Sequence, residues 1–189
     1  MKKRIFDVIL SLSGLIVSSP LILFIFVVLF LFQKKPIFFV QERIGRYGRP
    51  FNIYKFRSMR IVSEQNEMPR LTIYNDSRQT PIGKFLRKHH LDELPQLWNV
   101  LKGDMSIVGP RPEQQYYIEK IIEHNPRYVE LYQVRPGLTS YASLYNGYTD
   151  TMDKMLRRLD MDLDYLEHQS VWTDMVIMAK TVKIMIKGD

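Results

Sequence analysis

The most prominent pattern in the chain is a long apolar stretch near its start. No charged side chain occurs between Val8 and Phe32, and residues 21–32 are apolar without interruption. As one helix, these 25 residues would extend about 37 Å, which exceeds the bilayer hydrocarbon core of about 30 Å. The pattern predicts a membrane segment over residues 1–33 and a separate compact domain over residues 34–189.

Two features predict that this segment enters and leaves the membrane on the same side. Basic residues flank it at both ends, Lys2-Lys3-Arg4 and Lys34-Lys35, and basic flanks tend to stay cytoplasmic. In its middle, Pro20 cannot donate a hydrogen bond to the carbonyl of Ile16, which a serine hydroxyl can occupy instead. We therefore predict a re-entrant helix broken at Ser19-Pro20. A straight transmembrane helix and a cleaved signal peptide are the alternatives, but no small-x-small cleavage site follows the segment.

The pattern after this segment predicts strands and then a loop. Residues 38–59 are typical of two short strands, with apolar residues 38–40 in the first and an alternating run, 51–54, in the second. Gly45 and Gly48 lie between them and predict a turn. Residues 61–80 are polar and turn-rich and predict a mobile loop, and residues 83–87 predict the start of a short helix.

An amphipathic helix is predicted from about residue 91 to Lys102, with Gly103 as its stop. The apolar residues at helical spacing are Leu94, Leu97, Trp98 and Leu101. Pro95 must lie in the first turn, so Asp92 is expected at or beside the N-cap and Glu93 in the first turn. Capping alone would explain these two acids. The alternative is catalytic: one carboxylate attacks phosphorus while the other holds a divalent cation.

Arg111 is the second candidate for phosphate chemistry. It lies between Pro110 and Pro112, which restrict the backbone on both of its sides. A preset guanidinium suits a bidentate grip on phosphate oxygens. An ordinary solvent-facing turn is the structural alternative.

Two further helices are predicted near the C-terminus. The first, over residues 151–168, carries a stripe typical of a core helix: Met152, Met155, Leu156, Leu159, Leu163 and Leu166. The second carries another stripe: Val171, Met175, Met178, Val182, Met185 and Ile186. Because Lys180, Lys183 and Lys187 lie on its polar side, we predict a core helix with an edge at the membrane surface.

Charge and composition narrow the partners. The formal net charge is +7, and residues 34–60 hold eight basic residues against one acidic residue. This run directly follows the apolar segment, which favours lipid headgroups or a phosphorylated ligand. No nucleic-acid-reading motif accompanies it, so nucleic acid is not an expected partner. The chain has no cysteine, which excludes disulfides and thiolate chemistry.

Seven segments carry a resemblance to a known family: Ser19-Pro20; residues 36–45; residues 54–59, which include Lys55 and Arg57; residues 91–97; residues 103–112; residues 135–139; and Arg158, Asp162, Tyr165 and Ser170 in that order. Together they resemble the bacterial sugar transferases, or monotopic phosphoglycosyl transferases, over nearly the whole chain. With no large multi-span region before them, the chain resembles the minimal catalytic form.

The resemblance implies a fold and a reaction. The fold is α+β and mostly helical, with a re-entrant membrane helix, a short β-hairpin and amphipathic interfacial helices. A UDP-sugar gives its sugar 1-phosphate to a polyprenyl phosphate such as undecaprenyl phosphate, and UMP is released. The reaction begins the assembly of a bacterial glycoconjugate at the cytoplasmic face of the inner membrane, in contact with membrane lipid. The sequence indicates no oligomeric state.

The resemblance also implies residue roles. Asp92 matches the nucleophile, which forms a covalent phosphosugar intermediate, and Glu93 matches its partner, which binds Mg²⁺. Arg111 matches a phosphate-binding arginine, while Lys55, Arg57 and Asp162 match substrate-binding positions. Ser19-Pro20 matches the break in the membrane helix.

Three departures from the family pattern stand out. Lys35 replaces a glycine, His90 replaces a serine, and residues 138–147 differ from the usual form. The last stretch is expected to face the sugar donor, so the resemblance does not indicate which sugar is transferred.

Two other functions compete with this one. A non-enzymatic adaptor would bind anionic lipid through residues 34–60. A membrane-anchored glycoside hydrolase would use Asp92 and Glu93, but such carboxylates usually lie about 5 Å or more apart across the glycosidic bond.

Overall fold

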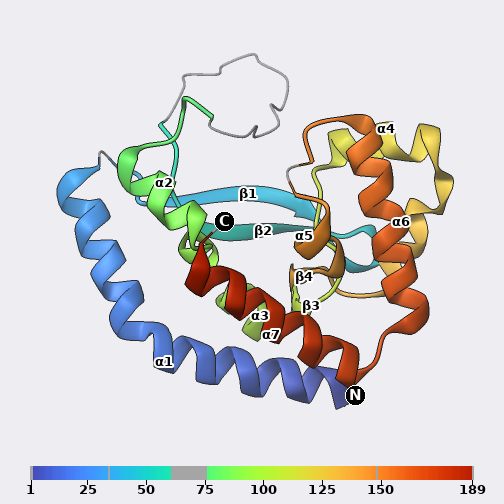
Figure 1. The fold of residues 1–189 in the computed structure, drawn as a ribbon, viewed down its shortest axis with the longest axis horizontal. Coiled ribbons are helices and arrows are strands. Elements are labelled where there is room, and N and C mark those ends of the chain that lie inside the picture. Colours follow the sequence, from blue (N-terminus) through green and yellow to red (C-terminus); the bar gives the residue numbers. More distant parts are fainter. Residues whose placement is uncertain (1, 34, 61–75, 148, 189) are drawn as a thin grey trace.

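A computed structural model describes residues 2–33, 35–60, 76–147 and 149–188, and helices predominate in it around two small sheets (Figure 1). The mostly helical α+β class predicted from the sequence is confirmed. The predicted loop over residues 61–80 lies largely outside the described residues, as does Lys34.

Helix α1 (Lys2–Phe32) contains the predicted membrane segment. It is long and apolar enough to cross a membrane, Pro20 lies inside it, and Figure 1 shows that it bends partway along. The Ser19 hydroxyl donates a hydrogen bond to the carbonyl of Ile16 at 2.8 Å, which is the local arrangement that the sequence predicts. Ser18 bonds the carbonyl of Gly14 at 2.6 Å in the same way. The carbonyl of Ile16, to which Pro20 cannot donate, therefore still accepts a hydrogen bond.

The first turns of α1 are bonded to the rest of the protein. Asp7 is only 2% exposed and accepts hydrogen bonds from the Ser106 hydroxyl (2.9 Å) and the Ile107 N–H (3.0 Å). Arg4 donates to the carbonyls of Val100 (2.6 Å) and Leu101 (2.8 Å), in the last turn of a neighbouring helix. The start of α1 is thus part of the folded body, whereas the predicted domain boundary at residue 33 stays a prediction.

The predicted strand pair is confirmed and is longer than expected. Strands β1 (Phe38–Ile44) and β2 (Pro50–Phe56) run antiparallel, with Phe38 opposite Phe56. The 3-10 helix η1 (Arg46–Gly48) joins them. Its Tyr47 and Gly48 have φ angles of 62° and 69°, so the chain reverses through the left-handed region. The hairpin presents Lys55 near its end.

The next helices place the two candidate carboxylates. Helix α2 (Pro81–Lys88) is followed by the 3-10 helix η2 (Leu91–Glu93) and by α3 (Gln96–Lys102). Helix α3 stops at Gly103 as predicted, with a φ of 100°. The expectation that Asp92 caps this helix is wrong, because Pro95 is the N-cap and both acids lie one turn earlier, in η2. His90, in the left-handed region at φ 51°, turns the chain into η2.

A short parallel sheet, not predicted from the sequence, supports the arginine loop. Strand β3 (Ser106–Val108) pairs with β4 (Gly137–Thr139). The two backbones approach so closely that a Cβ on Gly137 would lie 2.2 Å from the Gly109 nitrogen. The Gly137 N–H also donates to the carbonyl of Pro110 at 2.8 Å. These contacts fix the direction in which residues 109–112 leave the sheet.

The C-terminal helices form and cover the core. One apolar cluster joins Ile44 to α4 (Gln115–His124), the 3-10 helix η3 (Pro126–Gln133) and α6 (Met152–His168). The predicted stripe of α6 is confirmed as core, since Met155, Leu159 and Leu163 are buried. A second cluster lies around α3 and β3, and the side chains of Leu10 and Leu15 from α1 pack against it.

Helix α7 (Val171–Lys187) differs from its prediction. The stripe expected in the core is half-buried or exposed, and the buried positions of α7 are Asp174 and Ile177. The reason is that α7 packs through a narrow contact with β3, β4 and the short helix α5 (Tyr141–Tyr145). The predicted edge at a membrane surface stays a prediction.

Candidate active site

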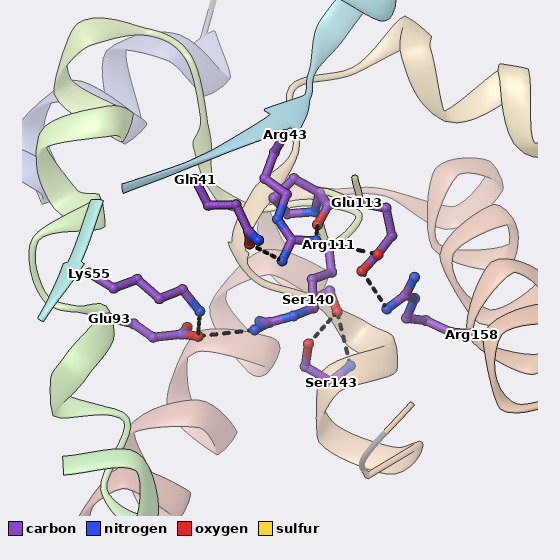
Figure 2. Close-up of polar contacts among 10 residues, drawn as sticks. Gln41, Arg43, Lys55, Glu93, Arg111, Glu113, Ser140, Ser143 and Arg158 are labelled. Atoms are coloured by element: carbon purple, nitrogen blue, oxygen red, sulfur yellow. Dashed lines mark hydrogen bonds and ion pairs between the residues drawn. The ribbon is translucent and has the colours of Figure 1, made fainter. Parts of the chain in front are cut away.

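The centre of the candidate site is the carboxylate of Glu93, held between two cations (Figure 2). Its Oε1 accepts hydrogen bonds from Lys55 Nζ at 2.6 Å and from an Arg111 guanidinium nitrogen at 3.0 Å. Lys55 comes from β2, Glu93 from η2 and Arg111 from the loop after β3. The tertiary structure therefore brings together three residues that the sequence analysis selected separately.

Asp92 lies next to this group and is shielded from water. It is 4% exposed, and burial raises the pKa of its carboxyl above the ordinary value. The positive charges of Lys55 and Arg87 oppose that rise in pKa, whereas the charge of Glu93 adds to it. A desolvated carboxylate is a stronger nucleophile than a hydrated one, and nearby cations favour its ionised form.

The pKa of the neighbouring acid, Glu93, is shifted in the opposite direction. Burial alone would raise the pKa of Glu93, but the charges of Lys55 and Arg111 outweigh it and hold that pKa well below its usual range. Burial lowers the pKa of Lys55, and the Glu93 charge partly restores it. The Glu93 charge raises the pKa of Arg111. Glu93 is therefore a permanent anion, and Asp92 is the more basic of the two.

Glu113 fixes the loop that carries Arg111. Its carboxylate bonds Arg43 at 3.3 Å and Arg158 at 3.2 Å, and its carbonyl accepts from the Ile44 N–H at 2.9 Å. These contacts join β1, α6 and the segment after Pro112 (Figure 2). Burial would raise the pKa of Glu113, but the two arginines lower it. Arg111 thus projects from a segment that is tied down immediately after it.

Asp162 of α6 lies beside this group and is not fully paired. Its Oδ1 is buried without a hydrogen-bond partner among the described residues. Burial raises the pKa of Asp162 to about 7, against the opposing effects of Arg158 and of the backbone N–H of Arg111. The carboxyl of Asp162 therefore changes protonation near neutral pH, and it lies next to the backbone of Arg111.

Three basic residues of segment 34–60, Arg43, Lys55 and Arg57, are buried or half-buried. Of the two partners predicted for this segment, a phosphorylated ligand therefore fits these three residues better than lipid headgroups. Arg43 and Lys55 are drawn inward by Glu113 and Glu93. The backbone of Arg57 bonds Ile37 and the side chain of Gln33, near the end of α1. The substrate-binding role of Arg57 stays a prediction.

The carboxylates of Asp92 and Glu93 suit Mg²⁺ only if a bound ligand supplies part of the coordination shell of the ion. No group of three His, Asp or Glu side chains that could hold a metal occurs among the described residues. Mg²⁺ usually binds through one or two carboxylates plus waters and substrate phosphates. The permanently ionised Glu93 next to Asp92 fits that kind of site, and not a cage made of protein ligands alone.

Sequence reasoning missed several residues of this site. Arg43 and Glu113 were not selected, although Glu113 directly follows the Pro-Arg-Pro run. Arg87 was also missed, and its charge lowers the pKa of Asp92 from five positions away, a distance that corresponds to no standard motif. For Arg43 and Glu113 the signal is a contact over 70 positions of sequence, which neighbouring residues do not encode.

This arrangement can perform phosphoryl chemistry. It combines a buried carboxylate of raised pKa, an anion suited to a divalent cation, and the cations Lys55 and Arg111 facing the same point. Attack by a carboxylate on a diphosphate meets charge repulsion, and preorganised cations offset that repulsion.

Comparison with known proteins agrees with this chemistry. The sequence model of the family described as bacterial sugar transferase matches residues 1–188. A UDP-N-acetylgalactosamine-undecaprenyl-phosphate N-acetylgalactosaminephosphotransferase of Aeromonas hydrophila is 38% identical over 186 residues, covering 98% of this chain and 44% of the relative. A UDP-glucose:undecaprenyl-phosphate glucose-1-phosphate transferase of Escherichia coli K12 is 40% identical over 182 residues, covering 95% and 39%.

A shorter relative is covered more fully. The UDP-glucose:undecaprenyl-phosphate glucose-1-phosphate transferase of Caulobacter vibrioides is 36% identical over 191 residues, covering all of this chain and 71% of the relative. The chain spans about two-fifths of the length of the first two relatives. The named sugars of the relatives differ from one another.

Proposed function

The chain belongs to the bacterial sugar transferase family, and on that basis we propose that it transfers a sugar 1-phosphate from a UDP-sugar to undecaprenyl phosphate, releasing UMP. The observation that carries the proposal is the buried Asp92 beside a Glu93 carboxylate that Lys55 and Arg111 hold. The product begins the assembly of a lipid-linked glycan.

The proposed reaction consists of two successive displacements at the same phosphorus. A carboxylate oxygen of Asp92 attacks the phosphorus that carries the sugar, and the bond from that phosphorus to the bridging oxygen breaks, so UMP leaves. An oxygen of the lipid phosphate then attacks the same phosphorus, and the Asp92 carboxylate is released. The covalent intermediate allows a water-soluble donor and a lipid acceptor to use one site in turn.

The cationic side chains act on the charge of the diphosphate. Arg111, held by the tied segment 109–113, presents two parallel donors to phosphate oxygens. Lys55 keeps Glu93 ionised and lowers the pKa of Asp92. Glu93 would hold Mg²⁺, which would supply neutralisation of negative charge on the diphosphate. Asp162 contacts the backbone of Arg111, and its pKa of about 7 allows it to be protonated or ionised near neutral pH.

The membrane arrangement follows from α1. We infer that α1 is re-entrant: it bends at Ser19-Pro20 and leaves both its ends on the cytoplasmic face of the inner membrane. The exposed apolar side chains of α1, such as Ile16, Val17 and Phe24, then face lipid. The site opens at the depth where a lipid phosphate lies.

The test is release of UMP by purified protein in detergent or nanodiscs. We expect release only when a UDP-sugar, undecaprenyl phosphate and Mg²⁺ are all present, with loss of activity on chelation by EDTA. Asp92→Asn should lower the rate by about 10³-fold or more, because it removes the nucleophile. Asp160→Asn, an exposed acid on α6, is the matched control and should leave the rate unchanged.

The covalent step needs its own measurement. Donor incubated without acceptor should add the mass of one sugar phosphate to the peptide that contains Asp92. Full activity of Asp92→Asn, or an adduct on another side chain, would contradict the nucleophile assignment. A panel of UDP-sugars in the same UMP assay identifies the sugar.

The adaptor function is disfavoured by the buried positions of Arg43, Lys55 and Arg57. It would require salt-sensitive binding to anionic vesicles without UMP release by the unmodified protein.

A further inference from the structure

A hollow of about 240 Å³ lies between α5 and α7, apart from the ionic contacts of the candidate site. Its lining is mainly aromatic and aliphatic: Tyr141, Leu144, Tyr145, Trp172, Val176 and Ile177. The Tyr141 and Tyr145 rings lie 5.0 Å apart, centre to centre, tilted by 53° to each other, and together form an aromatic wall. A concave apolar lining with few polar groups is typical of a site for a hydrocarbon ligand.

One rim of the hollow carries a cation. Lys180 Nζ lies 5.2 Å from the centre of the Tyr145 ring and donates a hydrogen bond to its hydroxyl, which raises the pKa of the lysine. The ammonium group is solvent-exposed and positively charged at neutral pH. An apolar hollow with a cationic rim is complementary to a hydrocarbon chain that ends in a phosphate.

The hollow is joined to the candidate site through β4 and α5. Thr139 Oγ1 lies 2.7 Å from Thr181 Oγ1 of α7, and the Thr139 carbonyl accepts from the Gly109 N–H, two residues before Arg111. Ser140 caps α5 and appears with Arg111 in the close-up of Figure 2. Helix α5 follows Ser140 directly and has five residues, a length of about 7.5 Å.

We propose that this hollow binds the first isoprenoid units of the acceptor lipid, with the lipid phosphate directed along α5 toward Arg111. The proposal rests on the proposed function, which supplies a polyprenyl phosphate as the second substrate. The side chains at this end of α7 fit a lipid: Trp172 is 73% exposed, and Met175 is also exposed. Residues 138–147 depart from the family pattern, and three of them, Tyr141, Leu144 and Tyr145, line the hollow. The proposal therefore relates part of this departure to binding of the acceptor lipid.

A binding experiment can test this without turnover. The chain has two tryptophans, so Trp98→Phe leaves Trp172 as the single tryptophan, which is excited selectively at wavelengths that tyrosine does not absorb. In the Asp92→Asn background, titration with undecaprenyl phosphate in nanodiscs should shift the Trp172 emission to shorter wavelength and saturate. Inorganic phosphate, which lacks the chain, should leave the emission unchanged. Phosphatidylglycerol at the same mole fraction should give no saturable change.

A matched pair of variants locates the binding. Val176→Phe fills the hollow, while Val182→Phe adds the same group on the same helix at a position that is 54% exposed and outside the hollow. We expect at least about a tenfold weaker apparent affinity for undecaprenyl phosphate in the first variant and no change in the second. Equal thermal midpoints of the two variants show that both are folded. A smaller substitution, Val176→Leu, should give an intermediate loss.

Several results would overturn the proposal. They are equal affinities of Val176→Phe and Val182→Phe, an equal response to phosphatidylglycerol, or a response to inorganic phosphate alone. Failure of the proposed function is distinct, because it appears as absence of UMP release by the unmodified protein even when undecaprenyl phosphate binds. In an active protein, Val176→Phe should raise the KM for the lipid at least tenfold and leave the KM for the UDP-sugar unchanged.

Discussion

At the residue scale, the site gives two adjacent carboxyl groups opposite properties. Burial raises the pKa of Asp92, while Lys55 and Arg111 lower that of Glu93. Neighbouring acids with pKa values pushed apart are typical of sites where one group reacts and the other holds charge. The division comes from the partners of each side chain, since both acids belong to the same short turn.

Lys55→Met should move the pH profile of UMP release. Asp92 must be ionised to attack, so kcat/KM falls as the pH drops through the raised pKa of Asp92. Since the Lys55 charge lowers that pKa, its removal should shift the acid limb to higher pH and lower the plateau by about 10²-fold. Lys102→Met, which removes an exposed lysine paired with Asp104, is the control. An unshifted acid limb in Lys55→Met would show that Asp92 does not govern it.

Asp162→Asn should change how stability depends on pH. The pKa of Asp162 is about 7 in the folded protein and about 4 when unfolded, so between these values the folded state binds more protons. The contribution of Asp162 to the free energy of unfolding is therefore fully present below pH 4. It is lost as the pH rises to 7, and the loss amounts to up to about 4 kcal/mol. Thermal midpoints measured from pH 5 to 8 should fall less steeply in Asp162→Asn than in the unmodified protein. Parallel curves would contradict the assignment.

At the element scale, α1 contains a proline in its interior and, directly before it, two serines whose hydroxyls donate hydrogen bonds to backbone carbonyls. Ser19 bonds Ile16, and Ser18 bonds Gly14. In water such a break would cost little, but in lipid an unpaired carbonyl costs several kcal/mol. The serines therefore allow the bend within an apolar environment.

Pro20→Ala should convert α1 toward a straight span. Because the chain has no cysteine, single cysteines at positions 2 and 34 can be labelled selectively in sealed, oriented vesicles. We expect both positions to be labelled from the same face in the parent protein. In Pro20→Ala, a fraction should label at position 2 from the opposite face, while Val17→Ala, in the same helix, should not. Labelling of positions 2 and 34 from opposite faces in the parent protein would refute the re-entrant arrangement.

At the scale of the whole molecule, the start of α1 is bonded to the elements that carry the site. Asp7 bonds the two residues of β3 that lead toward Arg111. Lys3 donates to Asp174 and to the Tyr165 hydroxyl, and Tyr165 donates to Asp174 at 2.6 Å. The start of α1 therefore helps to set the position of the loop that carries Arg111.

Asp7→Ala tests this connection. It leaves the buried Ile107 N–H and Ser106 hydroxyl without their partner, at a cost of about 2–4 kcal/mol. We expect a lower thermal midpoint and reduced UMP release, whereas Asp160→Ala, at an exposed position of α6, should change neither. A normal midpoint for Asp7→Ala would show that the contact does not stabilise the fold.

Local pattern was enough to predict much of this fold. The apolar run of α1, the β1–β2 hairpin, the stop of α3 at Gly103 and the core stripe of α6 each leave a pattern that can be recognised within a short stretch of sequence. Periodicity failed for α7, because an apolar stripe has the same spacing whether protein or another phase covers it. It also missed β3 and β4, whose three residues each are too few to show alternation.

The candidate site was predictable only as separate parts. Asp92, Glu93, Arg111 and Lys55 could be selected from motifs, but their charge states depend on contacts over 18 and 38 positions of sequence. Arg43 and Glu113 could not be selected, since their significance lies in a contact between β1 and the segment after Pro112.

The sequence by itself determined the long apolar helix with its serine-supported break, the order of the main elements and the residue types available for phosphoryl transfer. The tertiary structure decided which acid is buried, which is held by cations, and which apolar face remains uncovered. The physical reason is that hydrogen bonding within a helix or turn is local, whereas desolvation and charge pairing depend on what the rest of the chain brings near.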